Sequence, residues 1–184
     1  MGIKKIDIFR FYYYWFDIEI EMYNDIVKEN NPVIGLYNYL NYMRVIRNFK
    51  KGKIEDVYNI VKNYKNNASS EMIYKLSDDL KNSNLLSGIT KKVYVAASKI
   101  LWLYNRKLVI MDNNNINVLK KLGYNVSNYE NYTISWETLF KENRQDIINL
   151  NIHYNLNNID KVVEEEWFQR RVFDMYLWKE FKNY

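Results

Sequence analysis

The sequence of 184 residues contains no cysteine, one proline, five glycines and one histidine. Without cysteine the chain forms no disulfide, uses no thiolate in catalysis and holds no cysteine-ligated zinc or iron–sulfur cluster. The scarcity of proline and glycine argues against a sandwich or barrel of many strands, in which these residues mark frequent turns. We therefore expect an all-α protein built from long helices.

Long apolar runs are also lacking. No uncharged apolar segment reaches the roughly 20 residues that a membrane span requires, and the start, MGIKKIDIFRF, has no signal-peptide cleavage site. The chain contains no Walker loop, dinucleotide-binding fingerprint or zinc-ligand pattern. We expect a cytoplasmic protein with no membrane association, no cofactor and no metal ion.

Positive charge is in excess. The net charge of +5 and the isoelectric point near 9.1 favour a polyanionic partner, of which nucleic acid is the commonest. Asparagine, lysine, isoleucine and tyrosine are all abundant, which is also what an AT-rich coding sequence produces. Charge alone therefore suggests nucleic acid but does not identify it.

Apolar residues spaced by three and four predict helices along the whole chain. The aromatic-rich stretch 9–27 fits a helix, although its FDIEIEM segment alternates like a strand; its aromatic stripe predicts core packing, with base stacking as the alternative. We expect a single all-helical domain over residues 1–184, with lobes of about 1–84 and 85–184. Further helices are expected at 32–46, 54–64, 70–82, 90–104, 113–122, 135–142, 145–152 and 159–182.

The segment LSGITKKVYVAASKILWLYNRKLVIMD, residues 86–112, combines a glycine turn with a helix expected to begin at Thr90. The N–H groups of such a turn that make no backbone hydrogen bond, together with the positive end of the helix dipole, can bind one anion. This segment is therefore a candidate phosphate-binding site. The candidate DNA-binding residues are Ser87, Gly88, Ile89, Thr90, Lys91 and Lys99.

LSGITKKV resembles the LPGVGxK signature of the helix-hairpin-helix DNA glycosylases, the superfamily that includes 8-oxoguanine glycosylase and endonuclease III. The resemblance is clearest over residues 85–123. It implies a two-lobed glycosylase-like fold, double-stranded DNA as the partner and excision of a modified or damaged base. It also implies a nucleophilic lysine at Lys92 and an essential aspartate at Asp112, twenty positions later.

The chemistry explains why these two residue types recur together. Breaking an N-glycosidic bond builds positive charge on the sugar, which a carboxylate in a water-poor pocket stabilises. A lysine amine of lowered pKa can attack the sugar C1′ and form a Schiff base that permits strand cleavage. We therefore expect Asp112 and Lys92 to be catalytic, with base release alone or with lyase activity as well.

Each candidate also has a structural interpretation. Lys92 can be a solvated surface residue, Asp112 can cap the following helix, and Lys99 can be the reactive amine, a phosphate contact or simply solvated. His153 is expected to be structural and the acidic run 164–166 to be solvated. Arg170 and Arg171 can contact DNA or pair with that acidic run.

Three functions follow from these observations. The leading one is a monomeric DNA glycosylase. Ser87 and Thr90 stand where the family has proline and a second glycine, which favours the alternative of a non-catalytic DNA-binding module, or a phage-defence or restriction component that acts with a protein partner. The third, a helical protein–protein adaptor, explains the many tyrosines and tryptophans but leaves the Lys92 and Asp112 spacing to coincidence.

Overall fold

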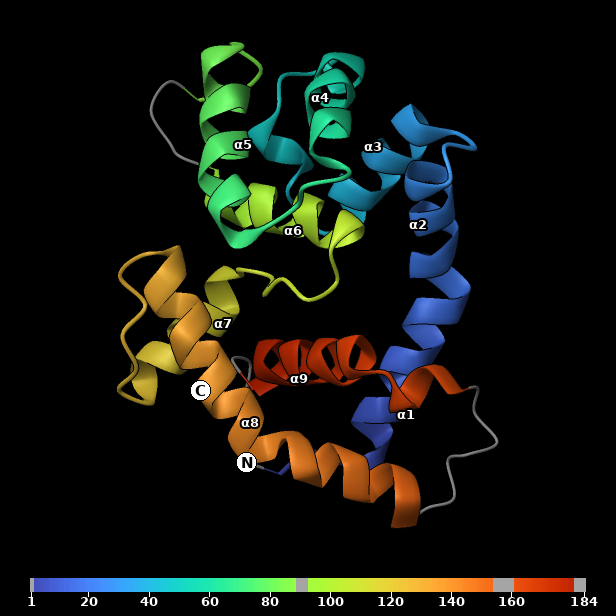
Figure 1. Ribbon diagram of the computed structural model, residues 1–184, viewed down its shortest axis with the longest axis vertical. Coiled ribbons are helices and arrows are strands. Elements are labelled where there is room, and N and C mark those ends of the chain that lie inside the picture. The colour runs from blue at the N-terminus through green and yellow to red at the C-terminus, as the bar shows by residue number, and fades with distance from the viewer. Residues whose placement is uncertain (1, 89–92, 154–160, 181–184) are drawn as a thin grey trace. The chain divides into compact units, whose positions relative to one another are not determined.

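The computed structural model describes residues 2–88, 93–153 and 161–180, and within these ranges the chain is helical with no strand (Figure 1). The all-α class expected from the sequence is thereby confirmed. Along the same ranges, no helix is both long enough and apolar enough to cross a membrane.

The chain divides into two compact units. Unit 1 contains Met1–Trp15 and Asp112–Tyr184, and unit 2 contains Phe16–Met111. This division differs from the expected lobes of about 1–84 and 85–184. Helices α5 (Ser70–Asn82) and α6 (Tyr94–Tyr104), which flank the expected boundary, pack against each other and so belong to the same unit.

Unit 2 is built around buried helix α6, to which α2 and α5 pack. Its other helices are α2 (Ile20–Val27), α3 (Pro32–Tyr42) and α4 (Ile54–Val61). Helices α2 and α3 approach closely at Gly35, where an added Cβ would lie 2.6 Å from the Asp25 Cβ. A side chain at this position would therefore force the two helices apart.

Helix α3 ends earlier than expected. The sequence pattern predicts helix as far as Ile46, but α3 stops at Tyr42 and a 3₁₀ turn, Ile46–Asn48, follows. Arg44 has a φ of 58°, and the Val45 amide donates to the Leu40 carbonyl at 2.9 Å. This left-handed termination satisfies the open carbonyls of the last helical turn and redirects the chain.

An apolar strip closes unit 2. Its four residues, 108–111, are all buried. The Met111 amide donates to the Ser98 hydroxyl oxygen at 2.9 Å, and that hydroxyl donates to the Val95 carbonyl at 3.1 Å. The strip is thus fixed to helix α6, and Asp112 follows it directly.

Unit 1 has an aromatic core. Its helices are α1 (Lys5–Tyr14), α7 (Asn113–Lys121), α8 (Tyr129–His153) and α9 (Glu166–Glu180). The ring of Phe11 lies 4.9 Å from that of Phe168, and Trp136 lies 5.2 Å from Phe173. Trp15 is also buried. The aromatic stripe of the N-terminal helix thus packs in the core at Phe11 and Trp15.

Other helix boundaries also differ from expectation. Helix α6 begins at Tyr94 rather than Thr90, and a π-helical turn, Trp15–Glu19, joins α1 to α2. The two helices expected at 135–142 and 145–152 are one continuous helix, α8. It starts early because the Asn128 side chain accepts a hydrogen bond from the Asn131 amide at 2.8 Å, which caps the first turn.

Helix α7 is confirmed, and the apolar spacing of Ile116, Leu119 and Leu122 predicts its buried face only in part. Gly123 ends the helix with a φ of 86°, as the sequence predicts. Leu122, expected on the apolar face, is exposed. Leu119 is buried as expected, and Asn115 and Val118 are buried with it; the polar Asn115 makes hydrogen bonds inside unit 1.

Candidate nucleic-acid interface

The LSG motif follows helix α5 in unit 2. Leu86 is buried, whereas Ser87 and Gly88 are exposed. Space around Gly88 is open, since an added Cβ would meet no heavy atom within 4 Å. The remaining motif residues, Ile89 to Lys92, lie outside the described residues, so their expected roles stay predictions.

The partner of this motif is a segment about forty residues earlier. Phe49 and Leu86 form an antiparallel bridge. The Lys50 amide donates to the Leu85 carbonyl at 2.9 Å, and the Ser87 amide donates to the Asn48 carbonyl at 2.9 Å. The Ser87 hydroxyl also donates to the Arg47 carbonyl at 2.7 Å. We call this pair of segments, residues 44–53 and 84–88, the basic corner.

Two helix ends shape the basic corner. Arg44 is left-handed two residues after the end of helix α3, and Asn84, whose φ is 56°, is left-handed two residues after the end of α5. The Leu85 amide then reaches back to the Leu80 carbonyl at 3.4 Å. Phe49 and Leu85 are both buried, so the two segments are anchored to the core of unit 2.

The basic corner has a concentrated positive charge. Residues 44–53 contain five cations and no acid, and all five are exposed: Arg44, Arg47, Lys50, Lys51 and Lys53. Lys53 pairs with Asp56 at 2.9 Å and Lys50 donates to the neutral Asn84 side chain at 2.6 Å. Within the described ranges, Arg47 and Lys51 contact no acidic side chain. Such a surface attracts phosphate groups.

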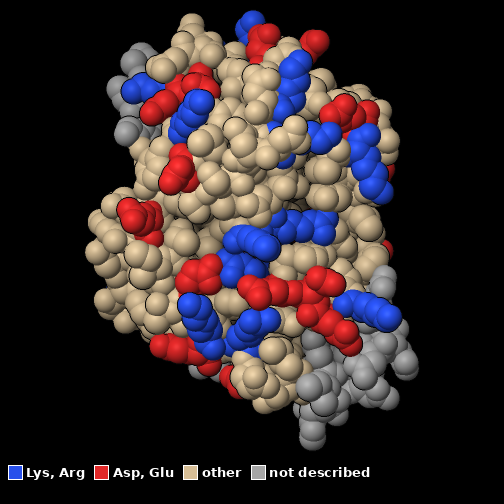
Figure 2. Space-filling model, viewed as in Figure 1, with Lys and Arg blue, Asp and Glu red and all other residues tan. Residues whose placement is uncertain are grey.

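Elsewhere the charges are mixed. On the face drawn in Figure 2, lysine and arginine side chains lie among aspartate and glutamate side chains. In unit 1, Arg170 forms an ion pair with Glu137 and a second, at 3.6 Å, with Glu166. The sequence alternative in which Arg170 pairs with the acidic run is therefore confirmed for Glu166.

Lys99 is not a surface lysine. Its side chain is buried in unit 2, where the ammonium group donates to the Met43 carbonyl at 3.1 Å. The Tyr39 hydroxyl donates to the Lys99 carbonyl at 2.9 Å. Of the three alternatives for Lys99, the solvated one is wrong, and burial leaves no surface on which Lys99 contacts a phosphate. A cation at the negative end of helix α3 stabilises that helix instead.

Asp112 is the first residue of the second segment of unit 1 and the N-cap of helix α7. Its Oδ1 accepts a hydrogen bond from the Asn114 amide at 2.9 Å, and the residue is half-buried. The capping interpretation is confirmed. The pKa of the Tyr132 hydroxyl is raised, mainly because the residue is buried. The negative charges of Asp174 and then Asp112 raise this pKa further.

Unit 1 also contains a buried polar network of Arg171, Asp174 and Asn115. The Arg171 Nη1 pairs with the Asp174 Oδ2 at 2.6 Å, and the Asn115 amide donates to the Asp174 Oδ1 at 2.6 Å. The Arg171 guanidinium also lies 5.6 Å from the centre of the Phe11 ring. Arg171 is therefore a structural cation of the core and not a DNA contact.

The chain matches no protein-family model, no curated protein and no solved structure. The glycosylase resemblance therefore rests on the sequence motif alone. His153 lies at the end of α8, and its side chain is outside the described residues.

Sequence reasoning missed the segment 44–53. Only its break at Lys50–Gly52 is visible as a helix end, and nothing in the apolar spacing indicates that it joins the LSG motif. The sequence feature that could have found this segment is its composition. Residues 44–53 contain five cations and no acid, whereas a solvated helix face usually mixes charges of both signs. The arrangement places five exposed cations on a turn whose backbone is fixed by hydrogen bonds.

Proposed function

We propose that this chain binds the phosphate backbone of double-stranded DNA through the basic corner. The observation that carries the proposal is the run of five exposed cations on a turn whose backbone is fixed by hydrogen bonds to residues 85–87. Binding then requires little ordering of the backbone. Phosphate contacts of this kind supply sequence-independent affinity and position a protein on the duplex.

The glycosylase resemblance supports the same stretch. In that family the hairpin motif grips DNA backbone, and here the exposed Ser87 and Gly88 lie beside the cationic segment. Helices α5 and α6, which flank the motif, pack against each other. A basic turn beside the motif offers phosphate contacts even though Ser87 and Thr90 depart from the family pattern.

The proposal predicts a specific loss in the double variant Arg47→Gln, Lys51→Gln. Each cation that contacts a phosphate contributes about one unit to the slope of log K against log salt. We expect the slope for a 20-base-pair duplex to become shallower by about two units, with affinity at least about tenfold lower at low salt. Fluorescence anisotropy over a salt series measures both quantities.

The matched control is Lys75→Gln, Lys120→Gln, which removes the same net charge from exposed positions on α5 and α7. We expect the control to bind nearly as well as the parent chain. Equal losses in the two double variants would mean that only net charge matters, and the basic corner would then not be the DNA site. Binding without any salt dependence would favour the protein–protein adaptor.

Excision of a base is the second candidate function, and the position of Asp112 favours it. Its half-buried carboxylate follows a buried apolar strip and lies close enough to Tyr132 to influence the pKa of that hydroxyl. In the proposed reaction this carboxylate stabilises the positive charge that develops on the sugar as the base departs. As the family resemblance implies, the neutral Lys92 amine forms a bond to C1′ while the bond from C1′ to the base nitrogen breaks, and the proton that the amine loses ends on the departing base.

A trapping assay tests this reaction. Borohydride should capture a covalent protein–DNA adduct on a lesion-bearing duplex, and Lys92→Gln should abolish the adduct while Lys75→Gln keeps it. Asp112→Asn should lower base release by about two orders of magnitude or more. Asparagine caps helices as well as aspartate does, so α7 should remain folded. Normal DNA binding with no base release across a broad lesion panel would instead support the non-catalytic module.

A further inference from the structure

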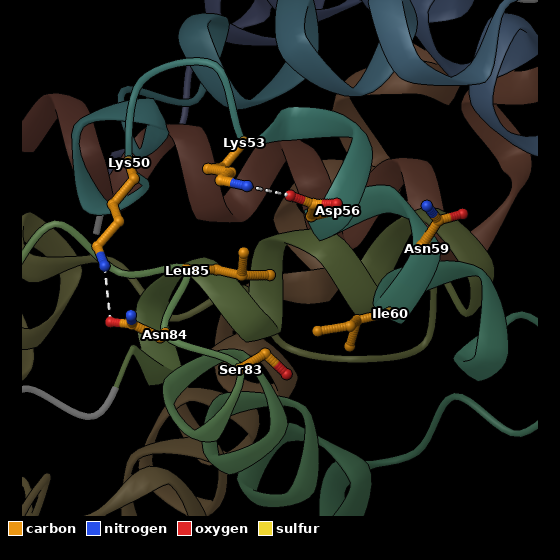
Figure 3. Close-up of a pocket in the computed structure, with 8 residues that line it drawn as sticks. All are labelled: Lys50, Lys53, Asp56, Asn59, Ile60, Ser83, Asn84 and Leu85. Atoms are coloured by element: carbon orange, nitrogen blue, oxygen red, sulfur yellow. Dashed lines mark hydrogen bonds and ion pairs between the residues drawn. The ribbon is translucent and has the colours of Figure 1, made fainter.

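A pocket of about 390 Å³ opens beside the basic corner in unit 2 (Figure 3). Its walls come from three places: the turn before α4, the outer side of α4, and the segment that follows α5. The lining residues are Lys50, Lys53, Asp56, Asn59, Ile60, Ser83, Asn84 and Leu85. The volume lies at the small end of the range for small-molecule sites and is far too small for a duplex.

The pocket has two lysines whose ammonium groups point in different directions in Figure 3. The Lys50 ammonium donates to the neutral Asn84 oxygen, and the Lys53 ammonium pairs with Asp56 (Figure 3). The side chains of Lys53 and Asp56 are 53% and 50% exposed. An ion pair this exposed contributes little free energy, so a phosphate with its several oxygens can replace the single carboxylate contact.

The rest of the pocket is apolar and amide-lined. Ile60 and Leu85 extend across the middle of the view in Figure 3, and Leu85 is held in the core of unit 2. Asn59, Asn84 and Ser83 offer donors and acceptors beside these two side chains. This combination fits a flat heterocycle, whose faces are apolar and whose edge carries donors and acceptors.

We propose that this pocket binds a single nucleotide, with its phosphate at Lys53, in place of the Asp56 contact, and its base against Ile60 and Leu85. The inference extends the proposed DNA binding, because a nucleotide that leaves the stack next to the basic corner would enter here. An inorganic phosphate would leave the apolar part of the pocket unfilled, and a nucleoside would make no charged contact with Lys53.

Titration of the full chain with each of the four deoxynucleoside 5′-monophosphates tests the proposal. We expect saturable shifts of the amide signals of Asn59, Ser83 and Asn84 in nuclear magnetic resonance spectra. Inorganic phosphate, which lacks the base, and the free deoxynucleosides, which lack the charged hydrogen bond, should each bind at least about tenfold more weakly. Comparable affinity for phosphate alone would overturn the proposal.

Two variants separate the pocket from the surface around it. Ser83→Tyr places a large ring at an exposed position on the pocket rim and should abolish nucleotide binding. Asp56→Asn removes the competing carboxylate and should raise nucleotide affinity severalfold. Unchanged nucleotide affinity in Ser83→Tyr, with a folded protein by circular dichroism, would contradict the assignment.

The two proposals can fail separately. Arg47→Gln, Lys51→Gln should lose duplex binding and keep nucleotide binding, because neither residue lines the pocket. Nucleotide binding in a chain that binds no duplex would remove the proposed function and leave the pocket assignment standing. A duplex with one unpaired nucleotide should bind more tightly than a fully paired one, and Ser83→Tyr should remove this preference; equal binding of both duplexes would exclude entry of a strand nucleotide.

Discussion

Replacing Asp174 with alanine is expected to lower the free energy of unfolding by about 3–5 kcal/mol, the usual loss when one partner of a buried ion pair is removed. Asp174 and Arg171 are both buried, and their charged atoms lie 2.6 Å apart. The variant also removes the acceptor for the Asn115 side chain. Chemical denaturation followed by circular dichroism measures the change.

Asp146→Ala provides the comparison. Asp146 is an exposed acid on α8, so its loss should change stability by no more than about 0.5 kcal/mol. A loss below about 1 kcal/mol in Asp174→Ala would mean that the network contributes little to unit 1. The account of Arg171 as a core cation would then be wrong.

The second large effect is expected for Phe49→Ala, at about 3–5 kcal/mol of lost stability. Phe49 is buried and holds residues 44–53 against Leu86. Without this anchor the amide protons of Lys50 and Ser87, which donate across the two segments, should exchange faster with solvent. Denaturation and hydrogen exchange measure the two consequences.

Tyr37→Ala is the matched aromatic control. Tyr37 lies on α3 and is 49% exposed, so the substitution should leave both stability and the exchange of those two amides nearly unchanged. Similar exchange rates in Phe49→Ala and Tyr37→Ala would contradict the view that Phe49 fixes the basic corner.

Helix positions can be predicted from the sequence because apolar spacing and capping residues are local signals. The start of α3 at Pro32, the start of α5 at Ser70 and the Asp112 cap of α7 all appear in the structure as expected. The end of α3 at Tyr42 could not be predicted, since Arg44 is an unfavourable residue for the left-handed turn that stops the helix.

The candidate site is less predictable than the helices. Ser87 and Gly88 are exposed as the phosphate-binding interpretation requires, but the cationic segment beside them comes from 40 residues earlier in the chain. The hydrophobic periodicity and helix propensity of a sequence do not indicate which of its turns pack together in the folded protein. Lys99 shows the same limit, because a lysine on a helix normally faces solvent. Here its ammonium group is buried in unit 2 and donates a hydrogen bond to the Met43 carbonyl, at the end of helix α3.

The most direct test of the central proposal is to map the amide signals that shift when a short duplex is added. The account predicts shifts at Lys51, Gly52, Ser87 and Gly88 that weaken as salt rises. Gly123, which ends α7 in unit 1 with an open, positive-φ turn like that of Gly52, should not move. Shifts centred on Gly123, with Gly52 and Gly88 unchanged, would contradict DNA binding at the basic corner.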